Sequence, residues 1–168
     1  GMDEDEVREK VMPMLAYFGL DSFTEVSPFA LSMGKRRLLS VATMLVLEQK
    51  LIILDEPTIS QDQVSSNLLM EYLDKLNKKG ISIIIISHDM RLISQWVDRA
   101  YVMCRSVTLF DGDTREVFNT PELLEKAALM APPLSELMWA LRKEGVEVPN
   151  TVFTVDRFMD IYRKEKNA

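Results

Sequence analysis

Two apolar runs constrain the fold of this chain more than any other feature. They are "LIILD" at 51–55 and "ISIIIIS" at 81–87. Continuous apolar runs of this length are typical of parallel strands that are covered on both faces. Residues 62–79 between them have helical spacing and end at the stop signal Gly80. The sequence therefore predicts an α/β protein with a mostly parallel sheet, whose strands are buried on both faces.

Helical segments are expected on both sides of this strand–helix–strand unit. The spacing predicts a helix over 5–18, which Pro13 interrupts with a kink or a late start. Ser32 is expected to cap a second helix that runs to about residue 48. After the strands, the patterns predict a short helix at 90–97 and a hairpin at 100–112. Three more helices are predicted at 121–129, 134–144 and 155–166. We divide the chain into a helical part, an α/β core portion and a helical C-terminal extension, at 1–50, 51–112 and 113–168.

The dipeptide Gly34-Lys35 looks like the end of a phosphate-binding P-loop, but its surroundings do not. A P-loop reads G-x-x-x-x-G-K-[ST], and here Phe29 and Arg36 occupy the positions of the first glycine and of the hydroxyl residue. The basic run instead falls in the first turns of the helix that Ser32 is expected to cap. That end of a helix favours anions. Positive charge at a positive helix end therefore predicts an anion site.

Polar residues follow each of the two apolar runs. Asp55 and Glu56 end the first run, and His88 follows the second. The carboxyl ends of parallel strands are where open α/β sheets place their ligands. Asp55 would suit the water shell of Mg²⁺, while Glu56 could polarise an attacking water and His88 could contact a terminal phosphate. A solvated strand end and a structural histidine are the plainer alternatives.

Composition excludes some classes of function. The net charge of −6 argues against a surface that neutralises nucleic-acid phosphates, so no nucleic-acid partner is expected. With one cysteine, Cys104, and one histidine, the sequence provides neither an internal disulfide nor a zinc site. The longest apolar run is too short to span a bilayer, and the acidic N-terminus is not typical of a signal peptide.

Four motifs, in this order, resemble the ATP-binding subunits of ABC transporters: "LSMGK", "LIILDEP", "TISQD" and "IIISHD". The stretch "LSMGKRRLLSVATMLVLEQKLIILDEPT" has the family's spacing from the signature motif to the Walker B strand. The pair Gln61-Asp62 and the tail "GDTREVF…PELLEKAAL…PPLSELMWAL" are most similar to energy-coupling-factor ATPases, which serve importers of cobalt and vitamins. The resemblance covers residues 6–168 and implies a partial ABC-type P-loop NTPase fold with a helical C-terminal extension.

The resemblance implies that "LSMGK" is the signature motif, which reads LSGGQ in the family and closes over the γ-phosphate of an ATP held by a partner subunit. By position, Ser32 and Gly34 would supply the hydroxyl and backbone N–H contacts to phosphate. Asp62 would be the D-loop aspartate at the dimer seam. Met33 replaces the first glycine and could restrict the approach to phosphate, whereas Lys35 replaces glutamine and keeps a charge that suits phosphate.

The resemblance also assigns the residues after the strands. Asp55 would be the Walker B carboxylate that holds Mg²⁺ through water, Glu56 the catalytic base and His88 the switch histidine. The Walker A half of the family has no counterpart in this sequence. Because the P-loop supplies most of the positioning in such enzymes, we expect this chain alone to be inactive as an ATPase. ATP and Mg²⁺ are expected only with a P-loop-bearing partner.

Three interpretations are compatible with these observations. In the first, the chain is a truncated or split ATP-binding subunit of an energy-coupling-factor-type importer. It would then pair with a P-loop-bearing subunit or a missing N-terminal half, and with an integral membrane subunit at the cytoplasmic face of the membrane. In the second, it is a nonenzymatic interaction or regulatory module. The third, a lobe of a chromosome-maintenance ATPase, would need a long coiled coil and a basic surface, which this sequence lacks. An open strand edge also predicts a homo- or hetero-oligomer.

Overall fold

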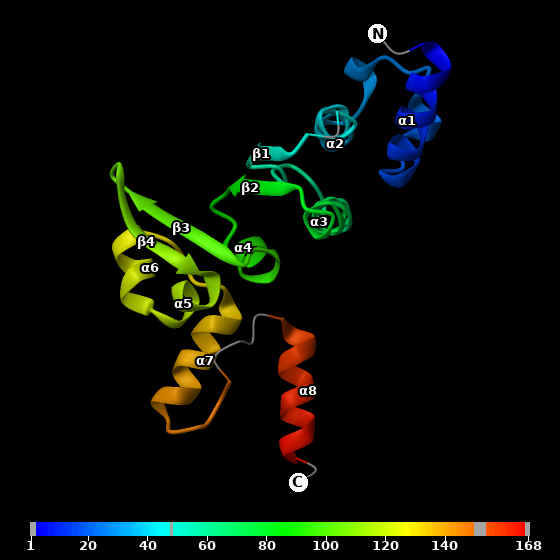
Figure 1. Cartoon of the computed structure of the whole chain (residues 1–168). Coiled ribbons are helices and arrows are strands. Elements are labelled where there is room, and N and C mark those ends of the chain that lie inside the picture. The colour runs from blue at the N-terminus through cyan, green and yellow to red at the C-terminus, as the bar shows by residue number, and fades with distance from the viewer. Residues whose placement is uncertain (1–2, 48, 150–153, 167–168) are drawn as a thin grey trace. The chain divides into compact units, whose positions relative to one another are not determined.

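A computed structural model of the chain describes residues 3–47, 49–149 and 154–166 (Figure 1). The chain divides into two compact units, Gly1–Ser87 and His88–Ala168. The three-part division, with boundaries after residues 50 and 112, stays a prediction.

The first unit begins with helix α1 (Glu4–Tyr17). Its start is fixed by a capping box, in which the Asp3 carboxylate accepts from the Glu6 backbone N–H at 2.9 Å and the Glu6 carboxylate accepts from the Asp3 N–H at 3.2 Å. The helix continues through Pro13, so of the two expected effects of this proline the late start is wrong and the kink stays a prediction. Two short 3₁₀ helices follow, η1 (Asp21–Phe23) and η2 (Pro28–Ala30).

Helix α2 (Met33–Leu45) begins where the sequence predicts it. The Ser32 hydroxyl accepts a hydrogen bond from the Lys35 backbone N–H at 3.4 Å and caps the helix. One face is buried and consists of Leu38, Val41, Ala42 and Leu45, at the spacing of a single helical stripe. The predicted end at about residue 48 lies outside the described residues.

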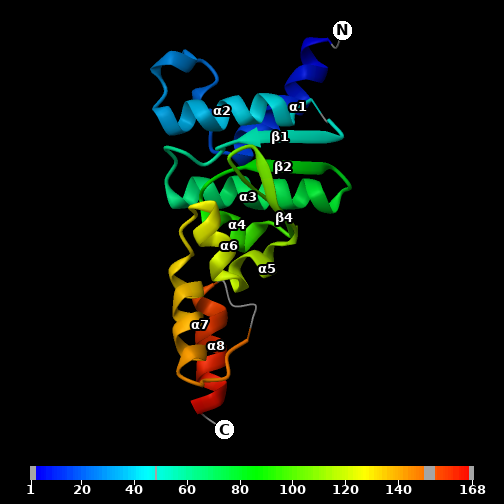
Figure 2. The same ribbon diagram turned by 90° about the vertical axis from the view of Figure 1, so that its left-hand side faces the viewer.

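Strands β1 (Leu51–Asp55) and β2 (Ser82–Ile86) form a parallel pair, joined by helix α3 (Gln63–Lys78). Figure 2 shows α3 running alongside the pair, and its buried residues are Ser66, Leu69, Met70 and Leu73. The register pairs the last residue of β1, Asp55, with the last residue of β2, Ile86. The strand–helix–strand arrangement predicted from the two apolar runs is therefore confirmed.

The prediction that both faces of these strands are buried is wrong. In β1, Ile52 and Leu54 are buried, but the alternating side chains are exposed. The exposed apolar side chains of the pair are Leu51 (47%), Ile53 (59%), Ile84 (48%) and Ile86 (55%). A continuous apolar run does not reveal which face is covered, and the described residues cover one face of β1 only. We call these four residues the open sheet face.

The second unit begins with helix α4 (Met90–Trp96) and a two-stranded antiparallel sheet, β3 (Arg99–Cys104) and β4 (Val107–Asp113). The turn residues Arg105 and Ser106 both have positive φ, at 50° and 63°, as a tight two-residue hairpin requires. The predicted hairpin is therefore confirmed. Helices complete the unit: α5 (Thr114–Asn119), α6 (Pro121–Ala127), α7 (Pro133–Lys143) and α8 (Val155–Lys166).

The core of the second unit lies between the hairpin and the helices that follow it. It consists of Val102, Val117, Phe118, Leu124 and Ala127. The Trp139 indole Nε1–H donates to the Phe118 backbone carbonyl at 3.0 Å and joins α7 to this core. None of the described helices is long and apolar enough to cross a membrane.

Candidate functional site

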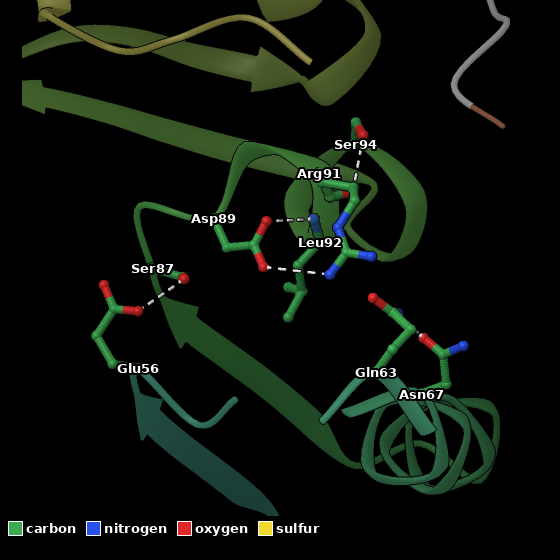
Figure 3. A network of polar contacts seen from close by, with 8 residues as sticks. All are labelled: Glu56, Gln63, Asn67, Ser87, Asp89, Arg91, Leu92 and Ser94. Carbon is green, nitrogen blue, oxygen red and sulfur yellow. Dashed lines mark hydrogen bonds and ion pairs between the residues drawn. The ribbon is translucent and has the colours of Figure 1, made fainter. Parts of the chain in front are cut away.

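The acidic turn after β1 is held at the carboxyl ends of both parallel strands. Asp55 ends β1 with an exposed side chain, and Glu56 follows it, half-buried. The Glu56 backbone N–H donates to the Ile86 carbonyl at 2.9 Å. Its carboxylate Oε2 accepts from the Ser87 hydroxyl at 3.0 Å, and Figure 3 shows the two side chains facing each other. The expected location of the two carboxylates at the strand ends is thus confirmed.

Helix α2 contacts this acidic turn through its first turns. The Arg37 guanidinium donates through Nη2 to the backbone carbonyl of Asp55 at 2.9 Å and also to that of Glu56. One turn earlier, a Cβ added at Gly34 would lie 3.3 Å from the Ser60 carbonyl oxygen. The start of α2 and the segment after β1 are therefore in close backbone contact. Sequence reasoning missed Arg37 as part of this site, although it singled out the basic run.

The side chains at the start of α2 differ in their surroundings. Ser32 caps the helix, and Met33 is 62% exposed. The Lys35 Nζ lies 3.7 Å from the centroid of the Phe23 ring, a cation–π contact with η1. At the expected anion site, the Lys35 ammonium group is therefore already in contact with an aromatic ring of the same unit.

The residues of the predicted D-loop close the turn between β1 and α3. Asp62 caps α3, because its carboxylate accepts from the Ser65 backbone N–H at 2.8 Å and from the Ser65 hydroxyl at 3.2 Å. The Ser65 backbone hydrogen bond holds the pKa of the Asp62 carboxyl below its usual 3.8. The Gln61 amide donates through Nε2 to the Pro57 carbonyl at 3.0 Å, which fixes the turn. The seam role of Asp62 stays a prediction.

His88 is the first residue of the second unit and is exposed. The next residue, Asp89, caps α4 by accepting from the Leu92 backbone N–H at 3.1 Å, and Arg91 pairs with it at 3.8 Å (Figure 3). The predicted proximity of His88 to Glu56 stays a prediction, because the two residues belong to different units.

The donors at the acidic turn suit a cation that takes most of its ligands from elsewhere. In the part of the chain that the structure describes, no group of three or more His, Cys, Asp or Glu side chains could hold a metal ion. Mg²⁺ is commonly bound through one or two carboxylates, waters and substrate phosphates. The exposed carboxylate of Asp55, at the end of a parallel strand, fits that mode of binding.

The sequence around this site is similar to that of known proteins. A family model described as "ABC transporter" matches residues 2–59, which include the start of α2 and the acidic turn. The energy-coupling factor transporter ATP-binding protein EcfA of Methanocaldococcus jannaschii is 35% identical over 169 residues, 99% of this chain and 61% of that protein. The chain is thus similar to the ATPase domains of ABC transporters, including an energy-coupling factor protein, and matches part of their length. A putative ABC transporter ATP-binding protein of Methanosarcina mazei is 37% identical over 164 residues, 96% of this chain and 28% of that protein.

Solved ABC transporter structures confirm the fold class. The structure of cbiO1 from Clostridium perfringens, part of the ABC transporter complex cbiONQ, is 31% identical, with a TM-score of 0.62. The match covers 83% of this chain and 56% of that one. A nucleotide-free ATP-binding cassette, 23% identical with a TM-score of 0.65, shares the fold. The resemblance to ABC ATPases is therefore confirmed. The chain spans 28% of the length of the Methanosarcina mazei protein and 61% of that of EcfA.

Proposed function

We propose that the chain supplies the signature side of a composite ATP site in an energy-coupling-factor-type importer. One observation carries the proposal. The Arg37 guanidinium holds the first turns of α2 against the Asp55–Glu56 turn. The start of α2 and the carboxylate pair at the end of β1 therefore belong to one packed unit, which supports a shared role in a phosphate site.

In the proposed role, the start of α2 contacts the terminal phosphate of an ATP bound by a P-loop-bearing partner. The N-terminal end of a helix has a favourable dipole and backbone N–H groups that can bind an anion. Ser32 would donate its hydroxyl and Gly34 its backbone N–H. Lys35 would leave the Phe23 ring or share it, and the exposed Met33 would set how closely the phosphate approaches. Asp62 would lie at the seam between the two subunits.

Where a missing N-terminal half supplies the P-loop, the acidic turn would act on the water and the metal. When bound, Mg-ATP supplies the phosphoryl group whose transfer to water the site accelerates. Asp55 would hold the water shell of Mg²⁺, and Glu56 would accept a proton from the attacking water. His88 would orient that water or contact the terminal phosphate. The hydrogen bond from Ser87 would keep the Glu56 carboxylate in one orientation.

The proposed partners are a P-loop-bearing ATPase subunit and an integral membrane transport subunit. The similarity to ABC transporter and energy-coupling factor proteins supports this assignment, as does the similarity to cbiO1, which is part of an ABC transporter complex. The open sheet face supports a further protein layer on β1 and β2. The complex would lie at the cytoplasmic face of the membrane, held there by the membrane subunit.

The first experiment is isothermal titration of the purified chain with Mg-ATP. We expect no binding up to about 1 mM nucleotide, because the backbone cradle and lysine of a P-loop bind most of the triphosphate. Binding at micromolar concentration would contradict the proposal and would make the segment from Ser32 to Arg37 the first candidate for an unusual phosphate cradle.

The second experiment is co-expression with a P-loop-bearing ABC ATPase subunit from the same genome. The purified complex should hydrolyse ATP, and Ser32→Ala should reduce the rate by about tenfold or more, as expected when a hydrogen-bond donor to the terminal phosphate is lost. Lys50→Gln, a change outside the site, is the matched control and should leave the rate unchanged. A stable complex whose ATPase rate is insensitive to Ser32→Ala would favour the nonenzymatic interaction module instead.

A further inference from the structure

We propose that Arg37 is a positioning residue for Glu56, which ties the conformation of the acidic turn to the start of α2. The inference rests on the proposed function only for the role of Glu56 as the base that accepts a proton from water. The contacts themselves involve no nucleotide and lie entirely within the first unit.

Glu56 has a backbone conformation that needs external support. Its φ is 45°, in the left-handed region that residues with a Cβ atom rarely adopt. Such conformations persist only where the surrounding structure over-determines them, and they gather at functional sites. Ser60, four residues later in the same segment, is also left-handed, at φ 63°. The turn from Glu56 to Ser60 is therefore shaped by its contacts rather than by local preference.

Two of the contacts of Glu56 come from the sheet. Its N–H donates to the Ile86 carbonyl at 2.9 Å, and its carboxylate accepts from the Ser87 hydroxyl at 3.0 Å (Figure 3). These contacts hold the backbone N–H of Glu56 and the carboxylate at the end of its side chain. The carbonyl that follows the Cα accepts a hydrogen bond from the Ile59 backbone N–H at 3.3 Å, within the same turn.

Arg37 holds that carbonyl. Its guanidinium donates to the carbonyls of Asp55 and Glu56. These carbonyls belong to the two peptide units on either side of the Glu56 Cα. A planar guanidinium presents several donors in a fixed geometry, whereas a lysine ammonium is a flexible point charge. Charge-assisted hydrogen bonds of this kind are stronger than neutral ones. Arg37 therefore adds support for Glu56 that comes from neither the sheet nor the turn itself.

The same interface contains a steric contact one helical turn earlier. The site of a Cβ at Gly34 lies 3.3 Å from the Ser60 carbonyl oxygen, so little space remains between α2 and the far end of the turn. With Gly34 against Ser60 and Arg37 against Glu56, the start of α2 touches both left-handed residues. A displacement of α2 would then move the backbone that carries the proposed base.

Nuclear magnetic resonance of the full chain without nucleotide tests the proposal. In Arg37→Gln, we expect the Glu56 amide to exchange about tenfold faster, the change that loss of one charge-assisted hydrogen bond implies. The carbonyl ¹³C resonances of Asp55 and Glu56 should shift, and the amides within β1 and β2 should keep their protection. Arg37→Lys should restore part of both effects, and Arg36→Gln is the matched control that should change neither.

Two results would overturn the proposal. Unchanged Asp55 and Glu56 carbonyl resonances in Arg37→Gln would show that the guanidinium does not hold them. A uniform loss of protection across the first unit would show that Arg37 only stabilises the fold. If Arg37→Gln fails to fold, the wild-type Arg37 Hη resonances decide, because a bound guanidinium gives slowly rotating, separately detected Hη signals and an unbound one does not. None of these readouts depends on ATP, so their failure is distinguishable from failure of the Mg-ATP experiments.

Discussion

The two sheets of this molecule each have two strands, but the residues on their exposed faces differ. In the second unit, the outer face of the β3–β4 hairpin is partly polar, and Arg99 pairs there with Asp111 through two hydrogen bonds of 2.9 and 3.0 Å. In the first unit, the exposed face of the parallel pair carries the four apolar residues of the open sheet face, with Asp55 and Ser82 as its polar residues. Antiparallel sheets commonly leave one face to water, whereas parallel sheets are almost always covered on both.

The comparison indicates which part of the molecule is complete by itself. The hairpin and the helices after it enclose a core of their own around Phe118. The parallel pair has one buried face, and the candidate site lies at the carboxyl ends of its strands. The chemistry proposed for this chain is therefore located on the sheet that still presents apolar surface, which agrees with a site completed by additional protein.

The largest expected effect is loss of the self-contained core in the second unit. Phe118 is 1% exposed, and Phe118→Ala should destabilise that unit by about 3–5 kcal/mol, through lost burial and the cavity left behind. Urea unfolding followed by tryptophan fluorescence measures this, because both tryptophans, Trp96 and Trp139, lie in the second unit.

The matched control is Met103→Ala on the outer face of the hairpin. Met103 is 64% exposed, and the change should alter the free energy of unfolding by no more than about 0.5 kcal/mol. Equal losses for the two variants would contradict the assignment of the core to the inner face of the hairpin.

The second prediction concerns the open sheet face. Ile53→Thr keeps a β-branched residue in the strand while it interrupts the exposed apolar surface. It should reduce self-association in sedimentation velocity and change stability by about 0.5 kcal/mol or less. Ile52→Thr, one residue earlier and buried, should instead cost about 2 kcal/mol or more, because it loses buried apolar surface and places a hydroxyl in the core. If Ile53→Thr proved as destabilising as Ile52→Thr, the face would be covered rather than open.

The sequence predicts the elements of this fold better than their surroundings. The two apolar runs identify β1, β2 and the parallel class, and Ser32 marks the start of α2. The same runs do not reveal the open sheet face, because a strand that is apolar at every position carries no period-two signal. Which face of the strands is buried depends on which helices or sheets pack against them, and this is a property of the assembled fold.

The candidate site is predictable to a similar extent. Asp55 and Glu56 follow from strand ends, since the direction of a parallel strand fixes where its carboxyl end lies. The partners of Arg37 do not, because backbone carbonyls are the same at every residue and give no sequence signal. The cation–π contact of Lys35 with Phe23 was equally hidden, since it depends on how the 3₁₀ turn η1 folds back on α2.

The smallest expected effect concerns the helix that lies alongside the parallel pair. The Ser65 backbone N–H donates to the Asp62 carboxylate and lowers its pKa below the usual 3.8. A group whose pKa is lower in the folded state stabilises the fold above its unfolded pKa and loses that contribution as the pH falls through the folded value. The first unit should therefore lose a small part of its stability below about pH 4. Asp62→Asn should cap α3 without this pH dependence, because asparagine is an equally good N-cap that does not titrate. Thermal unfolding of both proteins between pH 2.5 and 6 measures the difference, and parallel pH profiles would show that the cap contributes nothing through its charge.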